Sequence, residues 1–401
     1  MKLARLKDVI GSIITGEWGV EGNTVQVLRT TNFRNDGSLN FDNVVYRNIK
    51  REIVEKKKLR IGDIIIERSG GGPKQPVGRV VYYNLSAGDY LCNNFTSILR
   101  PSKIVDPRYL FYFMYNQHKL GVTQKFQNKT TGIINLKLDN YLSSISIPLP
   151  SLDQQTRIAH ILDSVDALRQ KDKELLAAYD DLLQAAFLDI FGDPLSNSKG
   201  WKVKTLSEVI SHIDSGWSPK CEAYPKKNDD HWGVLSLSAV TSRYYQPDYN
   251  KQLPIGIKPK INCEVNNGDL LFSRKNTREL VGACAYVFIT PPKLMLSDTI
   301  FRINYIKQKC DGIYLYYLIN SSNYRKYIQS LANGSSGSMP NISKEKLGKV
   351  VLPIPPMSLQ NQFAQIVTNI EAQKALAKQN LQQSEEMFNA LVQKAFNGEL
   401  L

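Results

Sequence analysis

The sequence lacks the features that mark several common classes of protein. Its five cysteines are scattered and include no C-x-x-C pair, which argues against a disulfide framework or a zinc site. Its four histidines show neither H-E-x-x-H nor H-x-H spacing, so we expect no metal centre. No apolar run approaches the ~18 residues that a membrane span needs, and residues 1–5 hold no apolar core of a secretory signal. We therefore expect a cytoplasmic protein that is not inserted in a membrane.

The sequence also has fewer acidic than basic residues. The 401 residues hold 51 Lys and Arg against 37 Asp and Glu, a net charge of +14 with a pI near 9.3. The apolar fraction of 42% suffices for folded cores, and the length suggests two or three domains of about 150 residues each. A basic chain of this size favours nucleic acid as its partner, and less so an anionic membrane surface.

An internal repeat is the strongest signal in the sequence. Short motifs of the first half recur in the same order in the second half, at an offset that drifts between 200 and 207 residues, as a few loop insertions would produce. Chance similarity of apolar patterns is a poor explanation, because the order holds over the full half-length. The matched pairs include 62–65 with 268–271, 147–150 with 352–355, Gln155 with Gln360, and Phe191 with Phe396.

Each repeat has a mixed part followed by a long helix. Residues 1–150 and 194–355 combine β-rich runs, broken by Gly, Asn and Pro, with one aromatic-rich helical segment each. Residues 151–193 and 356–401 are predicted as long helices that begin after a proline-rich stretch. We predict an α+β tandem repeat with pseudo-two-fold symmetry, in which two mixed α/β domains are joined by two long antiparallel coiled-coil helices. The alternative is that each helix packs only on its own domain.

Apolar residues in steps of three and four mark one face of each predicted helix, the pattern of a coiled coil. Asp172 interrupts the first stripe, and Lys374 and Ser384 interrupt the second. Other apolar residues, such as Leu176 and Leu183, are left for the domain or for partner subunits. The residues predicted to pair the helices are Ile161, Val165, Leu168, Leu175 and Leu182 in the first, and Phe363, Ile370, Leu381, Phe388 and Leu391 in the second.

Charge divides along the same boundaries. Residues 1–150 and 194–355 each hold 22 Lys and Arg against 12 Asp and Glu, so each has a net charge of +10. The two helical segments have net charges of −5 and −1. Contact with phosphates needs clustered Lys and Arg, so the mixed domains are the predicted nucleic-acid surfaces. The helices are predicted to be spacers or protein docking surfaces.

Three pairs of loops carry side chains suited to DNA. Base readout uses Arg or Lys for guanine and Asn or Gln for adenine, while Ser, Thr and Lys contact phosphates. Two of the loops follow a Val-Leu strand and a Gly-Asp strand, and the third is the Thr/Ser-Gly segment itself. The side chains after the Val-Leu strand differ strongly between repeats, which predicts an asymmetric target. The predicted DNA-binding residues are Arg29, Thr30, Thr31, Asn32, Arg34, Arg68, Ser69, Lys74, Asn94, Lys129, Thr130 and Thr131 in the first repeat, and Ser236, Ser238, Arg243, Ser273, Arg274, Lys275, Asn276, Ser335, Ser336 and Ser338 in the second.

Together these features resemble the specificity subunit of type I restriction–modification systems. The resemblance is carried by P-x-P-x-x-x-x-Q before each long helix, by the duplicated Gly-Asp segment and by the Thr/Ser-Gly loops, and it extends over essentially the whole chain. It implies two target recognition domains, each of which reads one half of a bipartite sequence in double-stranded DNA. It also implies that the helices set the spacing between the half-sites and dock two methyltransferase (modification) subunits.

The same resemblance implies a chain without catalysis or a cofactor of its own. S-adenosylmethionine would bind the partner methyltransferase subunits, and ATP and Mg would bind restriction subunits in systems that have them. In agreement, neither Pro-Pro segment fits a [D/N/S]-P-P-[Y/F/W] motif, and no Walker A motif occurs. Two alternatives stay open. One is a stand-alone nuclease or methyltransferase of unrecognised type, with Asp42 and Glu55 as candidate acids, and the other is a coiled-coil adaptor that binds only proteins.

Overall fold

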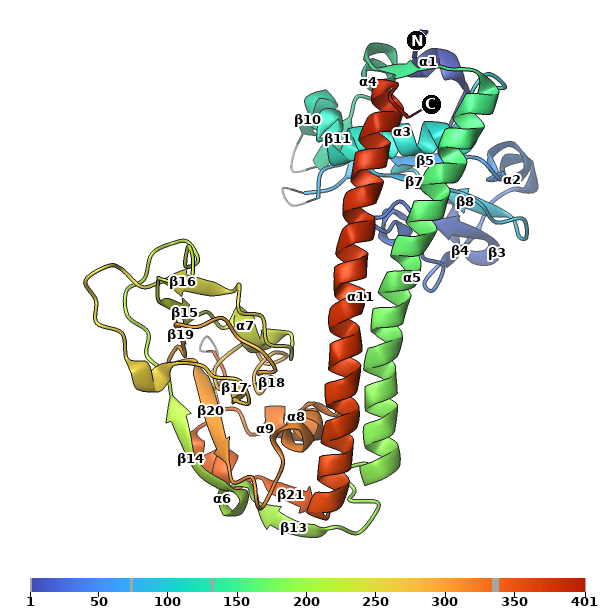
Figure 1. Cartoon of the computed structure of the whole chain (residues 1–401). Helices are drawn as coiled ribbons and strands as arrows, with labels where there is room; N and C mark the ends of the chain where they lie inside the picture. Colours follow the sequence, from blue (N-terminus) through green and yellow to red (C-terminus); the bar gives the residue numbers. More distant parts are fainter. Residues whose placement is uncertain (1, 73–74, 131–132, 334–338, 401) are drawn as a thin grey trace. The chain divides into compact units, whose positions relative to one another are not determined.

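The computed structural model describes residues 2–72, 75–130, 133–333 and 339–400, and the chain forms two compact units (Figure 1). Unit 1 comprises Met1–Lys173 and Gln379–Leu401, and unit 2 comprises Glu174–Lys378. Two long helices, α5 (Leu152–Phe191) and α11 (Met357–Asn397), lie where the sequence predicted them. Each unit contains a mixed domain with a segment of both helices, so the division of the chain falls within the helices and not at their ends.

Unit 1 is built on an antiparallel sheet of order β2-β9-β5-β7, in which all four residues of β5 are buried. Two three-stranded sheets, β4-β3-β8 and β10-β11-β6, and the pair β1-β12 complete it. The strands are β1 (Leu3–Arg5), β2 (Ile10–Thr15), β3 (Val20–Leu28), β4 (Val45–Asn48), β5 (Ile64–Glu67), β6 (Ser69–Gly70), β7 (Val80–Tyr82), β8 (Tyr90–Cys92), β9 (Thr96–Pro101), β10 (Gln127–Thr130), β11 (Ile133–Leu136) and β12 (Ser146–Pro148).

The aromatic-rich segment of unit 1 forms a buried helix, α3 (Pro107–Lys119). Asp106 caps it, because its carboxylate accepts hydrogen bonds from the amides of Arg108 and Tyr109. Its aromatic residues pack into the main core of the unit, together with residues of both long helices, so they serve the fold and do not stack on bases. The other helices are α1 (Leu6–Val9), α2 (Arg51–Lys57), α4 (Leu138–Ser144) and the short 3-10 helices η1 (Thr30–Asn32) and η2 (Val122–Phe126).

Unit 2 repeats this plan. Its sheets β14-β20-β17-β18, β16-β15-β19 and β13-β21 match three sheets of unit 1 strand for strand, including one parallel pair each, β3 with β8 and β15 with β19. The strands are β13 (Lys202–Thr205), β14 (Ile210–Ser215), β15 (Gly233–Leu235), β16 (Asn250–Gln252), β17 (Leu270–Ser273), β18 (Cys284–Tyr286), β19 (Leu294–Met295), β20 (Ile300–Tyr305) and β21 (Val351–Ile354). The helices are α6 (Leu206–Val209), α7 (Ser238–Thr241), η3 (Ile261–Cys263), α8 (Gly312–Asn320), α9 (Ser322–Ser330) and α10 (Lys344–Gly348).

The duplicated P-x-P-x-x-x-x-Q motif ties each long helix to the cap of the aromatic helix. The fully buried Gln155 accepts a hydrogen bond from the amide of Asp106 at 2.9 Å and donates one to the carbonyl of Pro150 at 2.9 Å. Gln360, also fully buried, makes the same two bonds, with the amide of Asp311 and the carbonyl of Pro355. A buried carboxamide needs such partners, so the motif is explained by the fold and not by catalysis.

In unit 1 the segments of α5 and α11 run antiparallel. The Arg169 guanidinium lies 4.2 Å from the centre of the Phe388 ring, and the Ser384 hydroxyl donates to Asp172 at 3.2 Å. Along α5 the residue numbers rise from 169 to 172 while those of the contacting residues on α11 fall from 388 to 384, so the two segments run in opposite directions. Arg169 is buried and lies 3.3 Å from Asp166, one turn earlier.

In unit 2 the other segments of the two helices pair in the same way. The rings of Phe187 and Phe363 are 5.6 Å apart, and the Lys374 ammonium donates to Asp180 at 2.6 Å. Lys374 is buried and also contacts Glu371, one turn earlier, at 2.7 Å. Lys374 follows Arg169 by 205 residues, the offset of the repeat, so each unit holds one buried cation in its helix pair.

The predicted pairing stripe is partly wrong for α5. Leu168, Leu175 and Leu182 are 46%, 43% and 52% exposed, so they do not form the buried seam. The buried face of α5 is shifted by about one residue from the predicted stripe. It includes charged residues that have partners inside the unit, and a search for apolar residues in steps of three and four does not detect them. Ile161, Val165, Ile370, Leu381 and Leu391 are half-buried and Phe363 and Phe388 are buried, whereas the buried face of α5 carries Leu162, Arg169, Asp172, Leu183 and Phe187.

Candidate nucleic-acid interface

The aspartate of the Gly-Asp segment forms an equivalent ion pair with an arginine in both units. Asp63 accepts the amide of Arg60 at 2.8 Å and both ends of the Arg100 guanidinium at 2.8 Å. Asp269 accepts the amide of Asn266 at 2.9 Å and the Arg302 guanidinium at 3.2 Å. Both aspartates are therefore turn residues, as predicted, and the strand that follows each of them is held at a fixed start.

In unit 1 the chain after β5 joins two of the predicted DNA loops. The amide of Leu136 donates to the carbonyl of Arg68 at 2.8 Å, and the Ser69 hydroxyl lies 2.5 Å from the Asn135 carboxamide oxygen. These contacts belong to the sheet β10-β11-β6, which brings residues near 69 together with residues near 129.

The first predicted loop is tied to the same place by a buried ion pair. Arg79 donates to both carboxylate oxygens of Glu67, at 2.9 and 3.2 Å. The same guanidinium donates to the carbonyls of Thr30 at 3.1 Å and Phe33 at 3.3 Å. Arg79 therefore holds the loop after β3 against the end of β5, and the three loops of unit 1 form one connected set.

Arg68 is the best placed basic residue of this set. Among the residues that the structure describes, its guanidinium donates to hydroxyls alone, those of Thr15 and Ser97, each at 3.3 Å. It lines a hollow together with Thr15, Lys137 and Asn140, among others. A guanidinium without a carboxylate partner keeps its charge and donors for an anion, and a phosphate or a base edge fits that chemistry.

In unit 2 the equivalent loops also meet. The amide of Ile342 donates to the carbonyl of Arg274 at 2.9 Å. The backbones of Lys275 and Asn341 form an isolated antiparallel β-bridge. The Asn276 carboxamide donates to the hydroxyl of Thr241 at 3.2 Å, at the end of α7. The first two predicted loops thus meet in unit 2 as well, and the second contacts the chain at 341–342, while residues 334–338 of the third loop lie outside the described residues.

Three predicted contact residues are buried and cannot reach DNA in this conformation. Asn32 accepts the amide of Arg29 and donates to the carbonyl of Asn40, so its carboxamide caps η1. Asn276 is used internally, as described above, and Ser273 is fully buried on β17. From the sequence alone, an Asn or Ser can be predicted equally well as a DNA contact or as a cap. In this structure these residues serve in caps, internal hydrogen bonds and strand packing.

The remaining predicted residues divide by exposure. Exposed side chains are those of Thr31, Arg34, Asn94, Ser238, Arg243 and Lys275, and partly exposed ones are those of Arg29, Thr30, Arg68, Ser69, Ser236 and Arg274. Arg29 and Ser236 are also bonded to backbone carbonyls, of Asn43 and Tyr249 respectively. Lys74, Thr131, Ser335, Ser336 and Ser338 lie outside the described residues, and Lys129 and Thr130 belong to β10.

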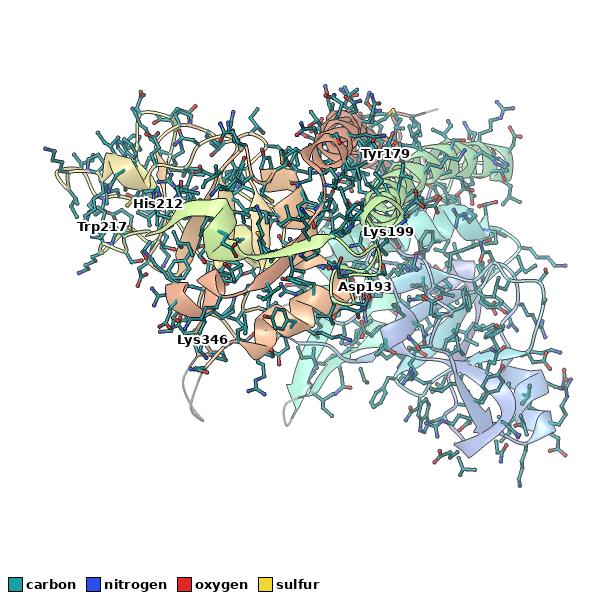
Figure 2. All side chains as sticks on the ribbon, turned by 90° about the horizontal axis from the view of Figure 1, so that it is seen from below. Tyr179, Asp193, Lys199, His212, Trp217 and Lys346 are labelled. Atoms are coloured by element: carbon teal, nitrogen blue, oxygen red, sulfur yellow. The ribbon has the colours of Figure 1, made fainter. Side chains whose placement is uncertain are left out.

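A tryptophan under a basic side chain recurs in both units and was missed from the sequence. The Arg47 guanidinium lies 4.0 Å from the Trp18 ring, and the Lys260 ammonium lies 4.8 Å from the Trp217 ring, which Figure 2 labels. Each tryptophan follows a glycine of the repeat, Gly16 or Gly216, closely. Trp18 lies two residues after Gly16 and Trp217 one residue after Gly216, so the signal available in the sequence was a tryptophan close to the same glycine. Cation–aromatic pairs near a basic surface suit contact with nucleic acid.

One candidate acid of the alternative enzyme hypothesis, Glu55, is engaged in ion pairs. Glu55 on α2 pairs with Arg51 and, at 2.8 Å, with Lys58, which makes it part of a surface ion-pair network. Across the described ranges, no three His, Cys, Asp or Glu side chains gather closely enough to hold a metal ion. No helix in that part of the chain is both long and apolar enough to cross a membrane.

Sequence comparison decides the family. The model of the type I restriction modification DNA specificity domain matches residues 4–177 and again residues 198–386. The chain belongs to this family. The two matches cover the two repeats, so two recognition domains stand in tandem, and the protein is a DNA specificity subunit of type I restriction–modification systems.

Individual relatives support the assignment. The EcoEI specificity subunit of Escherichia coli is 34% identical over 172 residues, which cover 43% of this chain and 28% of that protein. The StySPI specificity subunit of Salmonella potsdam is 24% identical over 398 residues, covering 93% of this chain and 82% of that one. The crystal structure of a type I S subunit from M. genitalium shares the fold, with a TM-score of 0.60 at 13% identity, over 98% of this chain and 96% of that one.

Proposed function

We propose that this specificity subunit reads an asymmetric bipartite DNA sequence, one half with each unit, and that it has no catalytic site of its own. The observation that supports the proposal is that, in both units, the first two predicted loops meet at the end of the Gly-Asp strand and contact the chain that follows the third loop. The framework is shared while side chains differ, for example Glu67 and Ser69 in unit 1 against Ser273 and Lys275 in unit 2. Different reading surfaces on one framework select different half-sites.

The proposal includes two methyltransferase subunits as partners, docked on the long helices. Leu168, Leu175 and Leu182 recur every seven residues, which places them on one side of α5, and each is about half exposed. A row of exposed leucines on a helix is a typical contact surface for an apolar partner helix. The leucines that do not pair α5 with α11 therefore have a role in the proposal.

The cofactors belong to the partners in this proposal. S-adenosylmethionine would bind the methyltransferase subunits, and ATP and Mg would bind restriction subunits where the system includes them. This chain would supply the specificity for the DNA sequence. Its helices α5 and α11 would set the spacing between the half-sites. In isolation it would bind DNA weakly, with an affinity that falls as salt rises.

The test is the adenine methylome of the source strain with and without this gene. Loss of one asymmetric, gapped motif is the expected result. Exchange of residues 1–150 for those of a relative should then change one half of the motif and leave the other half intact. A change in both halves, or methylation that persists without the gene, would contradict the proposal.

The docking surface has a separate test. Leu175→Asp with Leu182→Asp should abolish co-purification of the methyltransferase subunits, because charge is placed on an apolar contact. The control is Gln373→Asp, an exposed polar position on α11, which should leave co-purification unchanged. Loss of the complex in the control as well, or its survival in the double variant, would exclude the leucines as the contact.

A further inference from the structure

In both units the first reading loop is held by the helix pair. This loop is the chain that follows β3 or β15, residues 29–40 in unit 1 and 236–246 in unit 2. Its exposed side chains include the predicted DNA contacts Arg34 in unit 1 and Arg243 in unit 2. A contact between this loop and the segments of α5 and α11 in the same unit therefore links the predicted DNA surface to the long helices.

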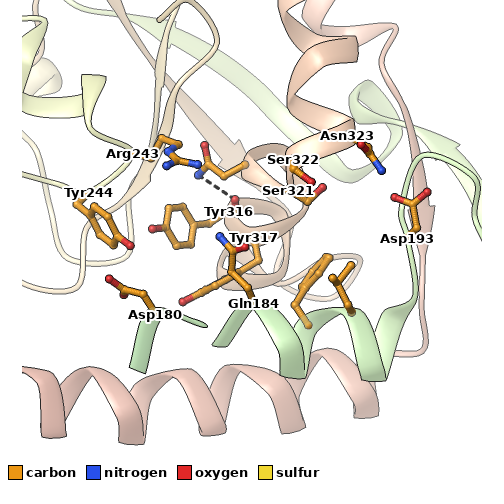
Figure 3. Close-up of a pocket in the computed structure, with 13 residues that line it drawn as sticks. Asp180, Gln184, Asp193, Arg243, Tyr244, Tyr316, Tyr317, Ser321, Ser322 and Asn323 are labelled. Carbon is orange, nitrogen blue, oxygen red and sulfur yellow. Dashed lines mark hydrogen bonds between the residues drawn. The ribbon is translucent and has the colours of Figure 1, made fainter. Parts of the chain in front are cut away.

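In unit 2 the contact is made by Tyr244, a residue of the loop itself. The Lys374 ammonium of α11 lies 5.1 Å from the centre of the Tyr244 ring, within the range of a cation–aromatic contact. The Tyr244 side chain points toward Asp180 of α5 (Figure 3), and Lys374 donates to the same carboxylate at 2.6 Å. Partial burial and the negative charge of Asp180 raise the pKa of the Tyr244 phenol. Tyr244 thus joins the ion pair that connects the two helices.

In unit 1 the equivalent contact is made through Tyr115 of α3. Its hydroxyl donates to the carbonyl of Asn35, in the first reading loop, at 3.3 Å. Burial raises the pKa of Tyr115, and the charge and the hydrogen bond of Arg169 oppose part of that rise, which places the guanidinium beside the phenol. The next loop residue, Asp36, accepts a hydrogen bond from Gln170 of α5 at 3.2 Å. Tyr115 and α5 therefore hold the tip of this loop together.

The tip of the loop in unit 1 also fits its surroundings closely. Gly37 has a φ of +86°, and a Cβ added to it would come within 2.6 Å of the Phe111 ring. The amide of Tyr82 donates to the carbonyl of Gly37 at 3.2 Å. The loop is thus seated against α3 and β7 as well as against α5.

The two units use the same position of the helix pair and different rings. Lys374 follows Arg169 by 205 residues, and both cations are buried. At the same offset Asn320, the last residue of α8, is the counterpart of Tyr115. The aromatic helix of unit 2 therefore has a carboxamide where α3 has a ring, and the loop supplies Tyr244. Because the contact recurs although the residue that makes it changes, the contact itself is the shared feature.

The backbone next to Tyr244 shows what the contact holds in place. Arg243 has a φ of +71°, in a region that residues with a Cβ rarely adopt. Its amide donates to the carbonyl of Val240 at 2.9 Å, and its guanidinium makes no hydrogen bond or ion pair with the part of the chain that the structure describes. An unfavourable backbone conformation persists where neighbouring contacts hold it, and Tyr244 makes the next contacts along the chain. The direction of an unpaired arginine thus depends on the helix pair.

We propose that the buried cation of each helix pair positions the first reading loop of its unit. Arg169 acts through Tyr115 in unit 1. Lys374 acts on Tyr244 in unit 2. This inference rests on the proposed function, because it assigns positioning residues to the reading of DNA. The long helices then determine the orientation of the first reading loops as well as the spacing between half-sites.

The test measures methylation by the full chain in complex with its methyltransferase subunits. The substrates are duplexes with the wild-type motif or with one base pair changed in one half, and discrimination is the ratio of the two rates. Tyr244→Ala should lower discrimination about tenfold in the half that the exchange of residues 1–150 assigns to unit 2, and leave the other half unchanged. Tyr244→Phe keeps the ring against Lys374 and should retain most of the discrimination. Tyr244 is 43% exposed, so we expect both variants to fold.

Variants of the cation and of unit 1 sharpen the test. Lys374→Met should lower discrimination about tenfold in the same half as Tyr244→Ala, and Lys374→Arg, which keeps the charge, should restore it. In unit 1, Tyr115→Phe removes the hydroxyl that donates to Asn35 and keeps the ring. It should lower discrimination about fivefold in the other half alone.

The matched control is Val367→Ala, which removes buried apolar atoms from α11 about two turns before Lys374. It loosens the helix pair of unit 2 and should leave discrimination unchanged. Equal loss in this control, or loss in both halves with Tyr244→Ala, would overturn the inference, because general loosening would then be the cause. Unchanged discrimination in Tyr244→Ala and Lys374→Met would overturn it and leave the proposed function intact. Absence of a gapped motif with the wild-type chain would contradict the proposed function and the inference together.

Discussion

The two units share one framework and differ in their loops and in the length of the aromatic helix. The paired sheets, the ion pair after each Gly-Asp segment and the buried glutamine before each long helix recur with the same partners. Arg169 and Lys374 even repeat a buried cation that contacts an acid one turn earlier. What differs are the loops beyond β5 and β17 and the length of the aromatic helix. The framework is therefore the part that both halves need to fold, and the differing parts are where we propose that recognition resides.

The largest expected difference between the units is at the end of the Gly-Asp strand. Glu67→Ala should destabilise unit 1 by about 3–5 kcal/mol, because it leaves the Arg79 guanidinium buried without its carboxylate. Ser273→Ala, at the equivalent place in unit 2, should change stability by about 0.5 kcal/mol or less, because the Ser273 hydroxyl has no hydrogen-bond partner among the described residues. Hydrogen exchange at the amides of β5 and β17 reports each unit separately.

Glu67→Gln is the control, since it keeps the shape and some hydrogen bonds, and it should fall between the two. Similar protection of β5 in the Glu67→Ala and wild-type chains would mean that Arg79 finds other partners and does not organise the loop after β3.

The next effect should be equal in the two units. Gln155→Ala and Gln360→Ala each leave a buried amide and a buried carbonyl unpaired, and each should cost about 2–3 kcal/mol in its own unit. The measurement is exchange protection of the first turns of α3 and α8. Gln154→Ala, at an exposed neighbouring position, is the control. A difference of more than about 1 kcal/mol between the two variants would show that the framework is not equally important in both halves.

The sequence was sufficient to predict the repeat and the two long helices, while the reading role of the loops stays a prediction. Order and spacing of motifs reveal a duplicated framework, because each copy must bury the same residues in the same places. The face of α5 was not predictable from apolar steps alone. Arg169 and Asp172 are charged and buried, and only their partners in space, Phe388 and Ser384, explain why they face inward.

Single contact residues were the least predictable part. Asn32 and Asn276 have the side chain that reads adenine, and both are used for internal hydrogen bonds. Residue type gives the chemistry of a loop, whereas burial and competing partners decide whether a side chain is free, and those depend on residues far away in the sequence.

A pH effect should distinguish the units next. Burial, and to a lesser degree the charge of Arg79, lowers the pKa of His118 from 6.5 to about 4. Between these values the unfolded chain binds a proton at this position and the folded chain does not, so unit 1 loses stability as pH falls from about 6.5 to 4. Because the side chain is partly exposed, we expect a loss of about 1–2 kcal/mol.

The counterpart in unit 2 is Asn323, which does not titrate. His118→Asn should therefore flatten the dependence of the unfolding free energy of unit 1 on pH in this range, measured by hydrogen exchange at several pH values. Unit 2 provides the internal control. The same slope in the variant would assign the effect to other groups.

The smallest effect should come from single exposed cations of the reading loops. Arg34→Ala in unit 1 and Lys275→Ala in unit 2 should each weaken binding of a random-sequence duplex by about 0.5–1 kcal/mol and reduce the slope of log K against log salt by about 1. The measurement is a salt titration of binding anisotropy. Lys171→Ala removes the same charge from an exposed position on α5, so it separates a local contact from a change in net charge. Equal slopes in all three variants would mean that the overall charge of the chain drives binding. A reduced slope in the two loop variants alone would show that both units contact the backbone with the loops on which they differ most.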